Sequence, residues 1–117
     1  MPTSNVEPKR GEIWSLNFDP TVGHEQSGTR PALIVSEDTF NSGPAGLVIV
    51  VPVTSRNKRI RTHVEVAPPE GGITLNSYIK CEDVRSVSIF RLKELLGSVT
   101  SDTLLEVEDR LRVLIGL

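Results

Sequence analysis

The sequence of 117 residues has few of the residue types that build disulfides, metal centres and aromatic surfaces. Its single cysteine, Cys81, excludes an intramolecular disulfide and fits a reducing compartment. Its two histidines, His24 and His63, are far apart and form no ligand cluster with that cysteine, so we predict no metal and no other cofactor. The sequence also lacks a GxSxG elbow and a glycine-rich phosphate loop, so no motif specifically supports a serine hydrolase or a nucleotide-binding enzyme.

Long apolar runs are missing as well. No run approaches the length of a membrane span, and the first ten residues lack the apolar core of a signal peptide. We therefore expect no membrane partner and a cytoplasmic location. We expect residues 1–8 to form a disordered tail and residues 9–117 to form a single domain, a length that suits one hydrophobic core.

An excess of basic residues is also missing, because 13 Lys and Arg face 15 Asp and Glu for a net charge of −2. That balance is unusual for a protein that binds long duplexes. The distribution of the charges is more informative: four cations and no acid lie between Val53 and His63, namely Arg56, Lys58, Arg59 and Arg61. A basic strip of this kind can hold a short single strand on a mildly acidic body.

The hydrophobic pattern predicts a mainly β domain. Apolar and polar residues alternate or form short β-branched runs in six segments, which we predict to be strands: residues 12–18, 30–36, 47–54, 62–67, 77–81 and 84–89. The last two segments could also form one bent strand. The run at 47–54 is apolar throughout, so both of its faces should be covered. Closely spaced short strands followed by one helix favour a small β-barrel capped by a C-terminal helix.

Two helices are predicted near the end of the chain. Residues 91–96 are expected to form a short helix that Gly97 stops. For the C-terminal helix, Ser98 to Asp102 offer several N-cap candidates, and Thr103 has capping-box spacing to Glu106. The helix carries an apolar face. This second helix should cover one opening of the barrel.

The stretch from Asp19 to Ser36 combines a turn-rich polar half with a buried strand. Its loop contains His24, Glu25 and Gln26, and its strand starts at Arg30. A loop and a strand start can present such groups at a site, and a guanidinium matches the geometry of a phosphate. The alternatives are a surface arginine paired with an acid and a solvated histidine without a role; an exposed His24 could also act as a base or acid near neutral pH.

Two further groups of polar residues follow apolar strands. Thr54 and Ser55 end the run at 47–54, where their hydroxyls could bind a phosphate or ribose, or simply bond the backbone at a turn. Lys80, Glu82 and Arg85 surround a break between two short strands, where a surface ion network is the alternative to a site. From the residues alone, the sequence indicates a small β-rich domain with an anion site.

Six segments in order resemble the MazF/PemK family of toxin endoribonucleases. They are RGEIW from Arg10, DPTVGHEQSGTRPALIVS from Asp19, TFN ending at Asn41, VVPVTSR from Val50, IKCEDVRSV from Ile79 and the C-terminal LIGL. The resemblance implies a small SH3-like β-barrel of the MazF/PemK/CcdB type with a C-terminal amphipathic helix, assembled as a homodimer. It also implies a toxin of a type II toxin–antitoxin system that binds a cognate antitoxin. It further implies metal-independent, sequence-specific cleavage of single-stranded RNA such as mRNA, leaving 2′,3′-cyclic phosphate and 5′-hydroxyl ends, with no DNA binding by the toxin alone.

The resemblance also assigns residues. It places the family's catalytic arginine at Arg30 and its threonine at Thr54, which we take as the catalytic pair. The substrate-binding residues expected around them are His24, Glu25, Gln26, Ser55, Arg56, Lys80, Glu82 and Arg85. In one branch of the family, arginine and aspartate stand where Lys80 and Glu82 stand here and are assigned the catalytic work. Lysine cannot grip a phosphate bidentately, which favours Arg30 with Thr54 in this chain.

Two other functions stay open at this point. A toxin of related fold would act on DNA gyrase through its C-terminal helix and would not need Arg30 in a GTRP setting. A catalytically inactive homologue would be a binding module, which the intact Arg30 and Thr54 disfavour.

Overall fold

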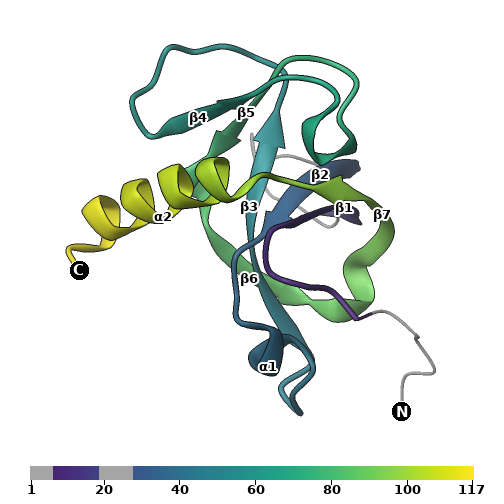
Figure 1. The fold of residues 1–117 in the computed structure, drawn as a ribbon. Helices are drawn as coiled ribbons and strands as arrows, with labels where there is room; N and C mark the ends of the chain where they lie inside the picture. The colour runs from purple at the N-terminus through teal and green to yellow at the C-terminus, as the bar shows by residue number, and fades with distance from the viewer. Residues whose placement is uncertain (1–6, 19–27) are drawn as a thin grey trace.

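The computed structural model describes residues 7–18 and 28–117, which form a curved, seven-stranded sheet with a C-terminal helix against it (Figure 1). Its strands are β1 (Glu12–Asn17), β2 (Thr29–Ile34), β3 (Leu47–Thr54), β4 (His63–Val66), β5 (Ser77–Lys80), β6 (Arg85–Ser88) and β7 (Leu92–Ser98). Its α-helices are α1 (Asp38–Asn41) and α2 (Ser101–Ile115), and its 3₁₀ helices are η1 (Glu70–Gly72), η2 (Cys81–Asp83) and η3 (Ile89–Arg91).

All strand pairings are antiparallel, and the sheet order is β4-β5-β3-β2-β1-β7, with β6 also paired to β3. Within the described ranges no pairing joins β4 to β7, so the sheet is strongly curved but open. The expected mainly β fold with a C-terminal helix is confirmed, whereas a fully closed barrel is not formed.

Strand β3 is the centre of the core. Val51 and Val53 belong to the apolar cluster that also contains Val107 of α2, and Val48 and Val50 belong to a second cluster on the other face. All four valines are almost fully buried, and burying such a side chain contributes about 1.5–3 kcal/mol. The prediction that both faces of this strand are covered is therefore confirmed.

Helix α2 begins within the range 98–102 that was predicted to supply its N-cap. Thr100 is the N-cap, and the Thr100 hydroxyl accepts a hydrogen bond from the Thr103 amide at 3.2 Å. The capping-box spacing of Thr103 and Glu106 does not mark the helix start, since Thr103 lies buried in the first turn. The helix packs onto the sheet through Val107, ends at Gly116 in a left-handed conformation, and is tied to the N-terminal segment by an ion pair between Glu108 and Arg10.

The predicted helix at 91–96 is wrong, because those residues form the end of η3 and most of β7. Strand β1 offers an open edge, and β7 pairs along it with Glu12 opposite Ser98. The backbone of η1 presses against β7 so closely that a Cβ on Gly72 would lie 1.9 Å from the Leu96 carbonyl oxygen. Gly72 has a φ of +74°, so only glycine suits this contact.

The predicted tail at residues 1–8 lies mostly outside the described residues. Pro8 is buried, and its carbonyl accepts a hydrogen bond from the Asn41 side-chain amide at 3.2 Å. Asn41 also donates to the Ser36 carbonyl at 3.1 Å. Its side chain therefore links α1 to Pro8, which precedes β1, and to Ser36, which follows β2. Within the described ranges, none of the helices has the length and apolar character needed to span a bilayer.

Candidate active site

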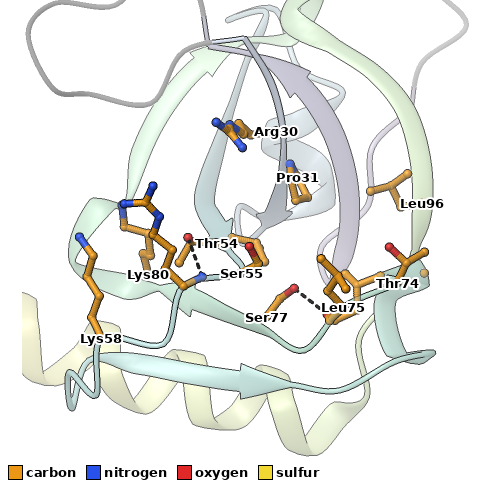
Figure 2. A pocket seen from close by; sticks show the side chains of 14 residues that line it. Arg30, Pro31, Thr54, Ser55, Lys58, Thr74, Leu75, Ser77, Lys80 and Leu96 are labelled. Atoms are coloured by element: carbon orange, nitrogen blue, oxygen red, sulfur yellow. Dashed lines mark hydrogen bonds between the residues drawn. The ribbon is translucent and has the colours of Figure 1, made fainter.

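A cleft of about 760 Å³ opens where β2 starts and β3 ends (Figure 2). Ala32 of β2 pairs with Pro52 of β3, so the antiparallel register brings Arg30 and Thr54 to the same edge of the sheet. The cleft is lined by Arg30, Pro31, Val53, Thr54, Ser55, Arg56, Lys58, Gly72, Ile73, Thr74, Leu75, Ser77, Lys80 and Leu96. Its volume lies within the range of typical ligand sites.

The charge in the cleft has one sign. Arg30, Arg56, Lys58 and Lys80 line it, and no carboxylate belongs to the lining within the described part of the chain. Cations gathered in a concave site raise the local concentration of anionic ligands. The cleft is therefore suited to a phosphate-containing ligand.

Arg30 lies exposed at the start of β2, opposite Leu16 of β1. Figure 2 shows its guanidinium projecting into the opening of the cleft. Among residues 7–18 and 28–117, no carboxylate forms an ion pair with it. Its five donors are therefore available to a planar or tetrahedral oxyanion.

Thr54 is half-buried at the end of β3, and its hydroxyl oxygen accepts a hydrogen bond from the Arg56 amide at 3.2 Å. This is the turn interaction that the sequence offered as the alternative to a binding role. Because the oxygen accepts, the hydroxyl hydrogen remains able to donate to a ligand oxygen. The same contact fixes the direction in which the basic loop, residues 55–61, leaves β3.

Lys80 lies at the end of β5 and lines the cleft, and it forms an ion pair with Asp83, which does not line the cleft. The Lys80 ammonium lies 3.0 Å from the Asp83 carboxylate, and its side chain is only 17% exposed. The carboxylate partly neutralises this cation, so Lys80 contributes less field to the cleft than an unpaired lysine would.

Glu82 lies next in the chain but does not line the cleft. Its carboxylate accepts a hydrogen bond from the Thr62 hydroxyl at 2.6 Å and lies 2.8 Å from Nε2 of His63. Burial alone would raise the pKa of Glu82, but the hydrogen bonds from Thr62, its own backbone and His63, with the charge of His63, bring its pKa below the ordinary value.

Arg85 also lies away from the lining, with its guanidinium 5.2 Å from the centre of the Phe18 ring and 4.0 Å from Asp83. Of the predicted binding residues, the structure brings Ser55, Arg56 and Lys80 to the cleft beside Arg30 and Thr54. His24, Glu25 and Gln26 lie outside the described residues.

The sequence prediction did not include the opposite end of the cleft. Thr74, Leu75 and Ser77 lie between η1 and the start of β5, and Leu96 lies on β7 (Figure 2). Leu75 is 63% exposed, and the Ser77 hydroxyl donates to its carbonyl at 2.8 Å. The sequence signal for this binding surface was a leucine among polar loop residues, Leu75 between Thr74 and Asn76. The position of Leu75 beside the cations could not be predicted, because it depends on the contact of η1 with β7.

Cys81, the residue after Lys80, is fully buried and belongs to the core. Burial and the Glu82 carboxylate raise the pKa of its thiol to about 12, against a smaller lowering by Arg110. The thiol is thus neutral and packed, and it is unsuited to act as a nucleophile. Within the described residues, no three His, Cys, Asp or Glu side chains gather to hold a metal ion.

The family model described as the PemK-like, MazF-like toxin of type II toxin–antitoxin systems matches residues 9–115. An endoribonuclease PemK of Escherichia coli is 43% identical over 82 residues, which are 69% of this chain but only 61% of that protein. A crystal structure of MazF from Deinococcus radiodurans is 35% identical, with a TM-score of 0.83 over 97% of this chain and 100% of that chain. A MazE–MazF crystal structure from the same organism is 34% identical, with a TM-score of 0.81 over 97% of this chain and 99% of that chain.

Proposed function

Because this chain belongs to the PemK-like, MazF-like toxins of type II toxin–antitoxin systems, we propose that it is a sequence-specific endoribonuclease that cuts single-stranded RNA without a metal ion. The observation that carries the proposal is the cleft itself, where the unpaired guanidinium of Arg30 and the Thr54 hydroxyl lie at one sheet edge without a lining carboxylate among the described residues. The name of the Escherichia coli relative supports the same activity.

The proposed reaction uses the RNA's own 2′-hydroxyl as the nucleophile. The O2′–P bond forms as the P–O5′ bond breaks, which leaves a 2′,3′-cyclic phosphate on one product and a 5′-hydroxyl on the other. The proton lost from O2′ passes to a base, for which His24 and Glu25 are the candidates, and the leaving O5′ gains a proton from a general acid or water. DNA lacks the nucleophile and is not cut.

Arg30 and Thr54 have distinct roles in this proposal. The Arg30 guanidinium stabilises the charge that develops on the phosphoryl oxygens, and the always-protonated fork suits that task better than proton donation. The Thr54 hydroxyl donates to one phosphoryl oxygen and orients the phosphate. Arg56 and Lys58 hold the adjacent backbone phosphates along the basic loop.

The far end of the cleft supports contacts with bases. Leu75 and Leu96 offer apolar surface beside the hydroxyl of Thr74, so an unstacked base can pack there while its phosphates stay at the cations. An arrangement with cations at one end and apolar surface at the other suits a nucleotide better than a simple inorganic anion.

The proposed partners are a second copy of the chain and a cognate antitoxin in the cytoplasm. Large apolar side chains are exposed on β7 and α2, notably Leu95, Leu105 and Val113, and such surface is typical of association sites. The Deinococcus radiodurans complex pairs that MazF with MazE, which supports an antitoxin here. Acidic residues of an antitoxin would compete with RNA for the cations of the cleft.

The decisive experiment incubates antitoxin-free protein with a long single-stranded RNA in EDTA and maps both ends of each product. We expect discrete cuts with cyclic-phosphate ends, and no cut when the nucleotide preceding each mapped site carries 2′-deoxyribose. Intact RNA after incubation with folded protein would contradict the proposal, and inhibition of DNA gyrase in a parallel assay would then favour the gyrase-type toxin.

A further inference from the structure

The basic loop between β3 and β4 is held at both of its ends. At the start, the Arg56 amide donates to Thr54 Oγ1 at 3.2 Å, and at the end the His63 amide donates to the Ile60 carbonyl at 3.0 Å. Every residue from Ser55 to Arg61 is exposed, so burial contributes little to the conformation of the loop. The direction in which its cations point therefore depends on how the two ends are anchored.

Glu82 forms one side-chain anchor at the second end, where Arg110 of α2 also donates from Nε to the Arg61 carbonyl at 3.0 Å. Its Oε1 accepts from the Thr62 hydroxyl at 2.6 Å, and its Oε2 lies 2.8 Å from His63 Nε2. Both carboxylate oxygens are thus engaged by the two residues that follow the loop. Glu82 itself sits next to Cys81, which is fully buried in the core, so the anchor has a rigid base.

His63 depends on this contact. Its side chain is only 4% exposed, and Nδ1 is buried with no hydrogen-bond partner among the described residues. The bond from Nε2 to Glu82 is therefore the side-chain contact that satisfies the ring there. Removing the carboxylate would leave both ring nitrogens unsatisfied at a buried position, which favours a shift of the strand start.

We propose that Glu82 is a positioning residue that fixes the basic loop over the cleft, and not the acid or base of the reaction. The inference rests on the proposed RNA cleavage, because the loop presents Arg56 and Lys58 to the substrate. Through Thr62 and His63, Glu82 keeps these cations at the edge of the cleft although its own carboxylate points elsewhere. Glu82 is thus close in sequence to Lys80, which lines the cleft, but it acts on the site indirectly, through the two residues that follow the loop.

The kinetic test compares Glu82→Gln, Glu82→Ala and Thr62→Val on an RNA that carries one mapped cut site. Glutamine can accept from the Thr62 hydroxyl through its oxygen and keep a hydrogen bond to His63 Nε2 through its amide group, so Glu82→Gln should keep kcat and KM near wild type. Glu82→Ala should raise KM about tenfold with little change in kcat, and Thr62→Val should raise KM about threefold. The double variant Glu82→Ala/Thr62→Val should have the same KM as Glu82→Ala, since Glu82→Ala already removes the contact that Thr62→Val would break.

A catalytic Glu82 gives the opposite pattern. Glu82→Gln would then lower kcat about 10²–10⁴-fold, and Thr62→Val would leave both constants unchanged. Either result overturns the positioning role.

A second measurement does not require RNA cleavage. Trypsin cuts after lysine and arginine, and Arg56, Lys58, Arg59 and Arg61 make the loop its natural target. Limited digestion of the native protein, followed by mass spectrometry, should show faster cutting between residues 56 and 61 in Glu82→Ala than in wild type and Glu82→Gln. Equal rates overturn the inference whether or not RNA is cut, whereas failure of wild type to cut RNA contradicts only the proposed function.

Discussion

Two charged stretches that each follow a strand behave oppositely in this fold. In the loop that follows β3, Arg56 and Lys58 line the cleft, and no ion pair to either is found within the described residues. In the segment that follows β5, Lys80 pairs with Asp83, and Glu82 bonds Thr62 and His63. Both stretches end a buried strand, so burial of the neighbouring backbone does not explain the difference.

The contrast separates charges that pair within the fold, such as Lys80 and Glu82, from charges that remain available to a ligand, such as Arg56 and Lys58. Cations gathered without counter-charges repel one another, which destabilises the folded state slightly and is relieved when an anion binds. Paired groups gain their interactions within the fold and have less to offer a substrate. The pairing state of a charge is therefore a better guide to the site than the charge count of a segment.

The largest effect is expected for Arg30, the cation at the start of β2. Arg30→Ala should lower kcat for RNA cleavage by about 10²–10³-fold, because it removes the donors that we propose stabilise the developing phosphoryl charge. Thermal unfolding should change little, since the side chain is exposed and forms no ion pair within the described residues. Arg112→Ala, which removes an arginine from α2 outside the cleft lining, is the matched control and should keep wild-type activity. Equal losses in the two variants would show that overall charge, not the cleft, governs the rate.

A smaller effect is expected for the loop cations. Arg56→Ala and Lys58→Ala should each weaken binding of single-stranded RNA and reduce the slope of log Kd against log salt by about 0.7, the value for one phosphate contact on a single strand. Titrations at four salt concentrations measure this slope. Lys93→Ala, an exposed lysine on β7 outside the cleft lining, should leave the slope unchanged. An unaltered slope in both loop variants would remove these cations from the binding surface.

Asp83→Asn converts a paired cation into an unpaired one. Freeing Lys80 should lower KM roughly threefold, because one additional unit charge in a cleft open to water contributes less than about 1 kcal/mol to phosphate binding. The melting temperature should fall slightly as the ion pair is lost. Asp109→Asn breaks the pair with Arg110 on α2 and serves as the control, with no change in KM. A KM that rises in Asp83→Asn would mean that the carboxylate is needed to orient Lys80.

The smallest effect concerns acid stability of the paired segment. Because the pKa of Glu82 is lowered in the folded protein, its contribution to stability is present above its ordinary pKa of 4.5 and is lost as the pH falls through the folded-state pKa. Glu82→Gln should therefore flatten the decline of the melting temperature below about pH 4.5 relative to wild type. Glu106→Gln, an exposed carboxylate on α2, should follow the wild-type curve. Parallel curves for Glu82→Gln and wild type would contradict the linkage.

Most strands could be predicted from the sequence because their apolar patterns match their burial. β7 could not, because Leu, Lys and Glu in residues 92–96 favour a helix locally and the strand exists only because the distant β1 offers its edge. The helix start was predicted only as a range: several residues between 98 and 102 can act as an N-cap, and packing selects Thr100 among them.

The candidate site divides in the same way. The meeting of Arg30 and Thr54 follows from two neighbouring antiparallel strands, so the sequence pattern was sufficient to predict it. The positions of Leu75 and Leu96 depend on a backbone contact between distant segments at Gly72, which no local pattern reports. The direction of the Glu82 side chain at a strand break is likewise fixed by Thr62 and His63, which are about 20 residues away.

The pairing of β1 with β7 has a consequence for the order in which the cleft forms during translation. Strand β1 is translated before its partner at Leu92–Ser98, and the cleft residue Leu96 is translated after Arg30 and Thr54. A nascent chain therefore holds Arg30 and Thr54 without a complete cleft around them. A cleft built with this connectivity is complete only after β7 has been translated, so a chain that ends before Leu92 is expected to lack the proposed activity.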